Sequence, residues 1–193
     1  MDARKLRSRD RIMAAARELL LELGSAGTTI DGIAARSGVA KTTIYRQWAS
    51  REALLLDLLT DATTPRAPAD TGTLAGDVSE LARGVAAELS EPFRAAALGA
   101  LLGGATTPES PDDELAGLRR GVAEERQAHA RRIVRKATAR GELPPRTDAA
   151  ELVRLVVGPI LYRRFAEGRP VTAAVADRIA SRALAALGAP TDA

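Results

Sequence analysis

Apolar side chains recur every three to four residues along most of the chain, which is the period of helices that bury one face. In the first sixty residues this pattern predicts four helices, at 12–23, at 30–36, at about 40–47, and after the N-cap Ser50. Gly24 follows the first of them, and Ser37-Gly38 follows the second. We therefore expect a cluster of short helices joined by tight turns.

The same period predicts five further helices beyond residue 60. They cover 73–89, 92 to about 102, a long segment up to about 140, 148–167 and 172–187. The stretches 63–72 and 103–113 are rich in Gly, Pro, Thr and Asp, and we interpret both as loops. Because no strand pattern is visible, we expect an all-α fold of about nine helices.

The helix predicted after Asp148 is apolar around most of its circumference, so it needs cover on more than one side. Asp148 and Glu151 match a capping box at its start. A second copy of the chain could supply that cover, at about 25 cal/mol for each Å² of apolar surface. The alternative is a central helix covered within its own subunit. The predicted dimer interface comprises Leu152, Val153, Val156, Ile160, Val175, Ile179 and Leu184.

The composition fits a helical protein of the cytoplasm. Hydrophobic residues make up 46% and charged residues 27% of the 193 residues, but aromatic residues only 3%, which favours aliphatic helix packing over a β-sandwich. The chain has no cysteine, which excludes disulfides and thiolate metal sites and favours a reducing compartment. Neither a secretory signal nor a membrane span is visible, so we expect no membrane association.

The positive charge is confined to the N-terminal part. Residues 1–60 hold ten Lys or Arg and seven Asp or Glu, a net charge of +3, whereas residues 61–193 hold eighteen of each. A basic surface on a neutral body suggests a polyanionic partner. A solvated basic tail, carrying residues such as Arg4 and Arg7, is the alternative.

The third predicted helix has the pattern of a DNA-reading helix. Ala40, Ile44 and Trp48 recur every four residues and can face the core. The outer side then carries Lys41, Thr42, Tyr45 and Arg46, with Thr43 at the edge. Threonine, lysine and arginine can bind base edges, and a tyrosine hydroxyl suits a phosphate. Three short helices in a basic segment thus predict a helix-turn-helix. Thr29, Ser50 and Arg51 flank it as possible hydrogen-bond donors to the phosphates of DNA.

The order and spacing of four motifs over about residues 10–57 resemble the DNA-binding domain of the TetR family. They are Thr29-Ile30-Asp31-Gly32-Ile33-Ala34, Ser37-Gly38-Val39, Thr43-Ile44-Tyr45-Arg46-Gln47-Trp48 and Arg51-Glu52-Ala53-Leu54. This sequence departs from the family where Trp48 replaces a usual Phe, Arg51 a usual Lys, and Ala40 a frequent Ser cap. The resemblance and the surface pattern together predict DNA contacts by Thr29, Lys41, Thr42, Thr43, Tyr45, Arg46, Gln47 and Arg51.

The resemblance implies a DNA-binding domain at 1–60 and a helical effector-binding and dimerisation domain at 61–193. It further implies a homodimeric repressor that a small-molecule effector releases from a pseudo-palindromic operator. An architectural or non-specific DNA-binding protein without a ligand switch is the alternative. An enzyme is not expected, because no nucleophile-base arrangement, phosphate loop or metal cluster stands out, and neither a cofactor nor a metal is predicted.

Family analogy places the effector site among the middle helices. The candidate residues are Val85, Phe93, Leu101, Leu102, His129, Ile133, Pro159 and Tyr162. Since aromatic residues are scarce there, we expect a small or elongated apolar effector. The single histidine, His129, lies one helical turn after Glu125; we interpret the two as an exposed ion-paired surface, with a metal pair as the alternative.

Overall fold

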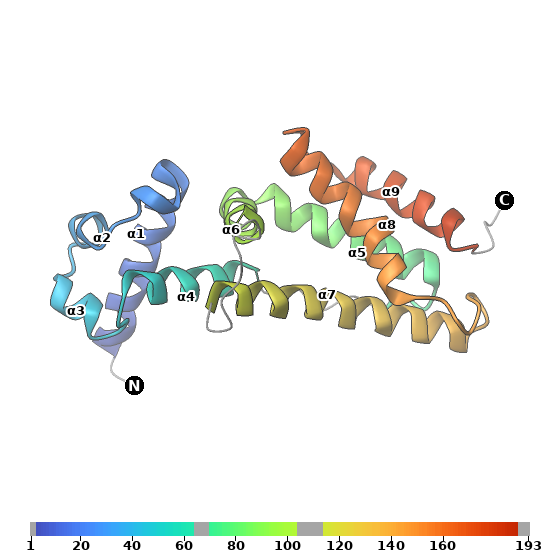
Figure 1. Cartoon of the computed structure of the whole chain (residues 1–193), viewed down its shortest axis with the longest axis horizontal. Helices are drawn as coiled ribbons and strands as arrows, with labels where there is room; N and C mark the ends of the chain where they lie inside the picture. The colour runs from blue at the N-terminus through green and yellow to red at the C-terminus, as the bar shows by residue number, and fades with distance from the viewer. Residues whose placement is uncertain (1–2, 64–69, 104–113, 189–193) are drawn as a thin grey trace. The chain divides into compact units, whose positions relative to one another are not determined.

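The computed structural model describes residues 3–63, 70–103 and 114–188. Within these ranges the protein has nine α-helices, one π-helical turn and no strand, which confirms the predicted all-α fold (Figure 1). The elements are α1 (Ala3–Gly27), α2 (Ile30–Ser37), α3 (Lys41–Tyr45), α4 (Arg51–Thr63), α5 (Leu74–Ser90), α6 (Pro92–Gly103), α7 (Glu114–Ala139), α8 (Ala149–Leu161), η2 (Tyr162–Ala166) and α9 (Ala173–Ala186). No helix in these ranges has the length and apolarity needed to cross a membrane.

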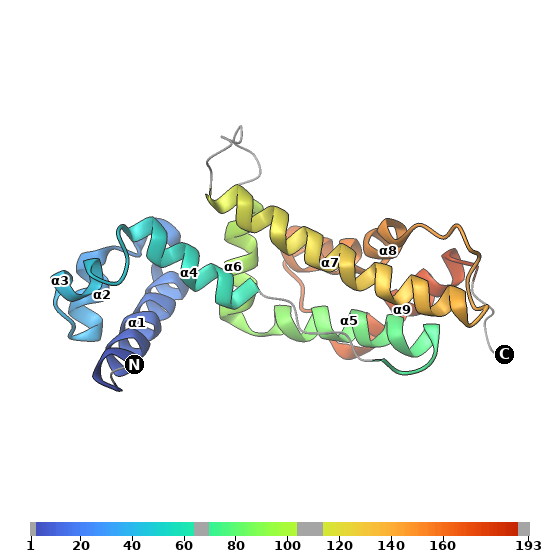
Figure 2. The same ribbon diagram turned by 90° about the horizontal axis from the view of Figure 1, so that it is seen from below.

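The chain divides into two compact units. Unit 1 comprises Met1–Thr64 and Pro92–Arg119, and unit 2 comprises Pro65–Glu91 and Arg120–Ala193. Unit 1 therefore includes α6, which lies beside α4 (Figure 2). Phe93 and Ala97 of α6 belong to the same buried cluster as side chains of α1 and α4. The functional boundary predicted at residue 60 stays a prediction.

The turns of unit 1 form where the sequence predicts them. Gly24 adopts φ +68° and interrupts α1, and Gly38 adopts φ +64° after α2, where its amide donates to the carbonyl of Ala34. The Thr29 side chain caps α2 by accepting from the amide of Gly32 at 3.1 Å. Helix α1 begins at Ala3, so the basic N-terminal segment is helical, and Arg7 within it is exposed to solvent.

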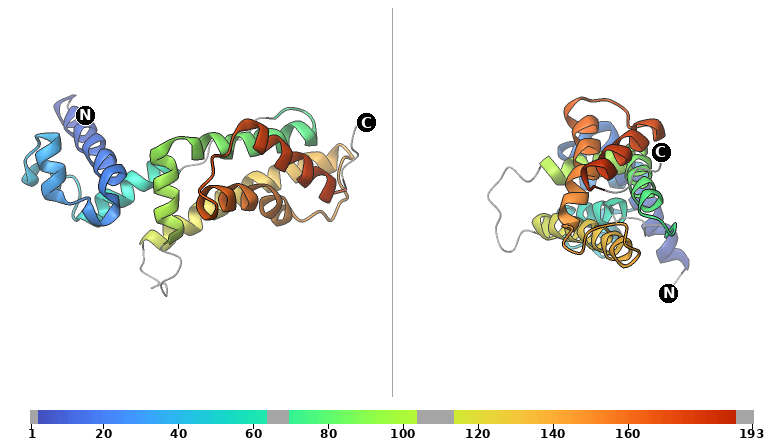
Figure 3. Two further views of the ribbon diagram at one scale, coloured as in Figure 1. Left: turned by 90° about the horizontal axis from the view of Figure 1, so that it is seen from above. Right: turned by 90° about the vertical axis from the view of Figure 1, so that its right-hand side faces the viewer.

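In unit 2, helices α5, α8 and α9 pack against one another (Figure 3). Leu152, Val156 and Ile160 of α8 are fully buried in this single chain. The expectation that they face a second copy was wrong, because the chain's own helices cover this side of α8. Val175 and Ile179 of α9 are likewise buried. The predicted residues with substantial exposed surface are Val153 and Leu184, which are half-buried.

Asp148 caps α8 as predicted, but the Glu151 carboxylate pairs with Arg154 and does not complete the predicted capping box, and the end of α8 also differs. Asp148 accepts from the amide of Ala150 at 2.9 Å, and Thr172 caps α9. Pro159 lacks an amide hydrogen, so the backbone ladder of α8 loses one bond near its end. The chain then widens into the π-helical turn η2, in which the amide of Glu167 donates to the carbonyl of Tyr162.

The predicted loops are only partly described. Thr63 is the last residue of α4, and Asp70 to Gly72 lead into α5. Residues 64–69 and the predicted loop residues 104–113 lie outside the described ranges. The start of α5 is tied to the region after α7, because the amide of Leu74 donates to Glu142 at 2.9 Å.

Candidate nucleic-acid interface

Helix α3 presents a polar outer face on a buried apolar support. Ile44 and Trp48 are buried, as the fourfold spacing predicted, but Ala40, which shares that spacing, is exposed because it lies at the N-cap, outside the helix. Tyr45 is 52% exposed. The other predicted contact residues of this segment also keep accessible surface: Lys41, Thr42 and Arg46 are exposed, and Thr43 and Gln47 are half-buried. The structure thus brings these six predicted residues together on one exposed segment.

Tertiary packing holds α3 in place more than its own caps do. Ala40, at the N-cap position, makes no side-chain cap bond. The helix spans only Lys41–Tyr45 and continues as a turn, in which the amide of Trp48 donates to the carbonyl of Ile44 at 3.0 Å. A helix this short has little intrinsic stability, so its orientation depends on the two buried anchors, Ile44 and Trp48.

Trp48 is fixed by a polar contact that sequence reasoning missed. Its indole Nε1 donates to Oδ2 of Asp57 on α4 at 2.9 Å, and Nη2 of Arg9 on α1 lies 2.7 Å from the same oxygen. The guanidinium carbon of Arg9 also lies 5.2 Å from the centroid of the indole ring. The available signal was the replacement of a usual Phe by Trp48, because a buried indole N–H needs an acceptor.

Arg51 is tied into the fold at the start of α4. Its Nε donates to the carbonyl of Thr28 at 2.7 Å, Nη2 donates to the carbonyl of Ser25, and Nη1 lies 3.1 Å from Glu52. The guanidinium thus joins α4 to the last turn of α1 and to Thr28 directly after it. Any phosphate contact by Arg51 would have to use the part of this group that remains exposed.

Several other cations of unit 1 also have partners inside the protein. Nη1 of Arg36 lies 2.7 Å from Glu22, and this hydrogen bond lowers the pKa of the Glu22 carboxyl. Arg11 donates to the carbonyl of Ser37. Lys41 contacts Asp31, and that carboxylate raises the pKa of the lysine. The charge available to a polyanion is therefore smaller than the sequence count suggests.

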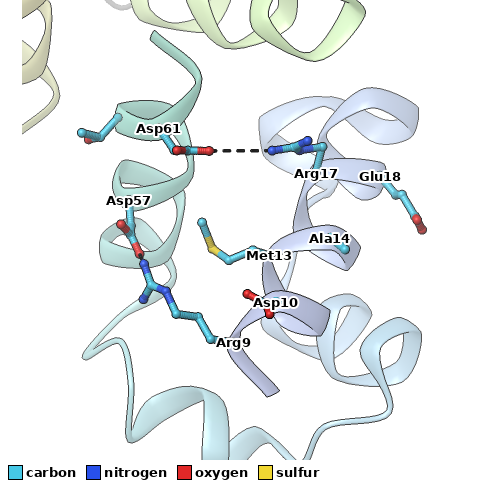
Figure 4. Close-up of a pocket in the computed structure, with 9 residues that line it drawn as sticks. Arg9, Asp10, Met13, Ala14, Arg17, Glu18, Asp57 and Asp61 are labelled. Atoms are coloured by element: carbon cyan, nitrogen blue, oxygen red, sulfur yellow. Dashed lines mark hydrogen bonds and ion pairs between the residues drawn. The ribbon is translucent and has the colours of Figure 1, made fainter. Parts of the chain in front are cut away.

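A polar groove of about 700 Å³ opens between α1 and α4 (Figure 4). Two ion pairs span it: Arg9 with Asp57, and Arg17 with Asp61 at 3.8 Å. Met13 and Ala14 contribute apolar surface between them. Arg17 also lies over the ring of Phe93, 4.5 Å from its centroid, and so joins α1 to α6. The paired charges make this groove unlike the apolar effector site predicted from the sequence.

The structure distributes the predicted effector residues over both units. Phe93 and Leu101 are buried in unit 1, where Leu102 is exposed. The others belong to unit 2: Val85, His129 and Ile133 are buried, and Pro159 and Tyr162 are exposed. Pro159 and Tyr162 line a groove of about 320 Å³ together with Val175 and Ile179, from the predicted dimer interface. The set as a whole does not form one pocket in either unit.

The prediction that His129 lies on an exposed ion-paired surface was wrong. Its side chain is buried, with 2% of the residue exposed, and its Nε2 lies 3.7 Å from Glu125. Burial lowers the pKa of the ring, the nearby charge of Arg132 lowers it further, and Glu125 opposes the shift. A periodic pattern cannot reveal this, because the covering side chains come from other helices. Among the described residues, no three His, Asp or Glu side chains gather as a metal site would require.

Comparison with known proteins agrees with this geometry. The family description "Bacterial regulatory proteins, tetR family" matches residues 12–58, and "Tetracyclin repressor-like, C-terminal domain" matches residues 68–183. The uncharacterized HTH-type transcriptional regulator YdeS of Bacillus subtilis is 31% identical over 177 residues, which are 89% of this chain and 87% of YdeS. AqdR of Rhodococcus erythropolis, also an HTH-type transcriptional regulator, is 28% identical over 82% of this chain and 74% of its own.

A solved structure shows the same architecture. The crystal structure of the TetR family transcription regulator SCO0332 superposes with a TM-score of 0.63 at 30% identity, covering 92% of this chain and 97% of that one. The two family matches together span the helix-turn-helix and most of the helices after it. This chain belongs to the TetR family of DNA-binding transcriptional regulators.

Proposed function

We propose that the protein is a homodimeric repressor that binds a pseudo-palindromic operator through α3 and leaves it when a small apolar effector binds. The observation that carries the proposal is the exposed polar face of α3, which extends from Lys41 to Gln47 and is supported by the buried Ile44 and Trp48. A face of this kind fits the major groove, where side chains reach base edges.

The residue types on that face suggest a division of tasks. Thr42, Thr43 and Arg46 can bind base edges, since hydroxyls donate and accept and arginine forms paired bonds with guanine. The Tyr45 hydroxyl suits a phosphate oxygen. The Thr29 side chain caps α2, and a helix N-terminus beside it attracts an anion through its backbone amides.

Pairing would use the sides of α8, η2 and α9 that the chain leaves uncovered. Val153, Leu155 and Leu184 are half-buried, and Pro159 and Tyr162 are exposed. With Tyr162 at 63% exposure, this surface offers an aromatic side chain of the kind that anchors protein interfaces. Two copies related by a two-fold axis would present two α3 helices to half-sites about 34 Å apart or a multiple of that distance.

The effector would act by favouring one separation of the two α3 helices over another. It can weaken DNA binding only through a difference in its affinity for the two arrangements. The chain passes directly from α5 of unit 2 into α6 of unit 1, and Phe93 of α6 packs in the cluster that contains α4. A shift of α5 could therefore reach α4 through covalent continuity and packing.

Selection of bound sequences from a random DNA pool tests the DNA-binding part of the proposal. We expect a site with two-fold symmetry. Tyr45→Ala should then weaken binding to that site about tenfold or more, because it removes the hydroxyl and the ring from the exposed face. Leu23→Ala is the matched control, since Leu23 is an exposed large side chain of the same unit outside α3. An unsymmetric pool, or equal losses in both variants, would contradict the proposal.

A further inference from the structure

An ion pair joins the N-terminal ends of α2 and α3. Asp31 lies in the first turn of α2 and Lys41 is the first residue of α3. The Lys41 ammonium contacts Oδ1 of Asp31, although both side chains are largely exposed, at 56% and 72%. The carboxylate raises the pKa of Lys41, so the contact favours the charged ammonium. The contact therefore places a negative charge beside the proposed DNA-binding face.

This pair matters for the charge of the DNA-binding face because other nearby cations already have partners within the protein. Arg9 is paired with Asp57, Arg36 with Glu22, and Arg51 with backbone carbonyls. On the segment from Lys41 to Gln47 the second cation is Arg46, which has no partner among the described residues. Asp31 thus decides whether this segment offers one free positive charge to phosphates or two.

We propose that Asp31 is a specificity-determining residue, which holds Lys41 away from phosphates and thereby weakens binding to arbitrary DNA more than binding to the operator. The inference rests on the proposed DNA interface. Non-specific binding depends almost entirely on phosphate contacts, so it loses the most when a lysine is neutralised. At the operator, the Lys41 ammonium still has donors left for the acceptors of a guanine edge.

Asp31→Asn removes the charge at nearly constant shape and provides the test. Affinities are measured for the duplex selected from the random pool and for a scrambled duplex, over a range of potassium chloride concentrations. The variant should bind scrambled DNA about fivefold more tightly near physiological salt. The slope of log affinity against log salt should steepen by about 1.8, the value for two added phosphate contacts, one from each subunit of the dimer. The preference for the selected duplex should fall accordingly.

Two further variants show whether Asp31 acts through Lys41. Asp31→Glu keeps the carboxylate and should retain the wild-type preference. In a Lys41→Gln background, Asp31→Asn should give no gain on scrambled DNA, because the charge that it would free is gone. Unchanged affinity and slope in Asp31→Asn would overturn the inference, and so would an equal gain in the Lys41→Gln background, which would show general repulsion instead.

The same measurements separate this inference from the proposed function. If the wild-type protein does not prefer the selected duplex, both fail. If the wild type discriminates and Asp31→Asn discriminates equally well, the inference about Asp31 fails alone. Circular dichroism of each variant checks that the helices are retained.

Discussion

Trp48 and Asp57 form a 2.9 Å hydrogen bond that joins the turn after α3 to the middle of α4. Trp48 is buried, and Asp57 also receives the guanidinium of Arg9 from α1. One carboxylate thereby connects α1, α4 and the turn that follows α3. Because α3 is short, the position of Trp48 sets the position of the residues before it.

Replacing Asp57 by Ala should destabilise the protein by about 2 kcal/mol, since the indole N–H would lose a charged acceptor in a buried place. Asp57→Asn keeps an acceptor oxygen and should cost less. Urea unfolding followed by circular dichroism measures both. The control is Asp61→Ala, one turn further along α4, because the more exposed Asp61 carboxylate lies 3.8 Å from Arg17. This substitution should lower the free energy of unfolding by less than about 0.5 kcal/mol. Equal costs for Asp57→Ala and Asp61→Ala would deny Asp57 this role.

Arg51 should contribute more to stability than a lysine could. Arg51→Lys keeps the charge but cannot reproduce the paired bonds to the carbonyls of Ser25 and Thr28, so we expect a loss of about 1–2 kcal/mol. Arg46→Lys, an exposed swap of the same kind, should leave the free energy of unfolding almost unchanged. If both variants unfold at the same urea concentration, the bonds from Arg51 to these two carbonyls do not contribute to the free energy of unfolding.

Stability should fall at mildly acidic pH because His129 is buried. Its pKa in the folded protein lies below the ordinary value of about 6.5, so the unfolded chain binds a proton more readily. The stabilisation is complete above that pH and is lost as the pH falls towards the lower folded value. The advantage of wild type over His129→Gln should therefore shrink between about pH 7 and pH 5.

Thermal or urea unfolding of the two proteins across this pH range provides the comparison. The charged groups around the ring, Glu125, Arg126 and Arg132 on α7 and Glu88 on α5, are present in both proteins and largely cancel. Parallel stability curves would mean that His129 ionises in the folded protein as readily as in the unfolded chain.

Substitutions at Leu152 and Tyr162 should affect the stability of the fold and dimerisation separately. Leu152→Ala should cost about 2–5 kcal/mol, because it leaves a cavity in the core of unit 2. Tyr162→Ala removes an exposed ring and should barely affect that core, but it should weaken dimerisation. Sedimentation under native conditions measures the second effect. A Tyr162→Ala protein with wild-type dimer affinity would exclude this residue from the interface.

Local signals in the sequence predicted local features well. The N-cap at Asp148 involves an amide two residues away, so the local pattern contains all that is needed. The fourfold spacing of Ile44 and Trp48 likewise predicted their burial, since one helix face is fixed by its own periodicity.

Contacts between distant segments were not predictable in the same way. Arg51 and Thr28 are 23 residues apart, and Arg9 and Asp57 are 48 apart, so nothing local indicates that they meet. Periodicity showed that α8 is apolar on several sides, but it could not show that the chain itself covers Leu152, Val156 and Ile160. The burial of His129 was missed for the same reason.

The burial of Leu152, Val156 and Ile160 within one chain bears on how pairs would form and dissolve. Their apolar surface is already removed from water in the single subunit, so we expect each subunit to keep its fold when the pair dissociates. Dissociation would then require no unfolding. When differently tagged dimers are mixed after purification, we expect subunit exchange at the rate at which the interface dissociates. This rate should be much faster than the unfolding of the chain.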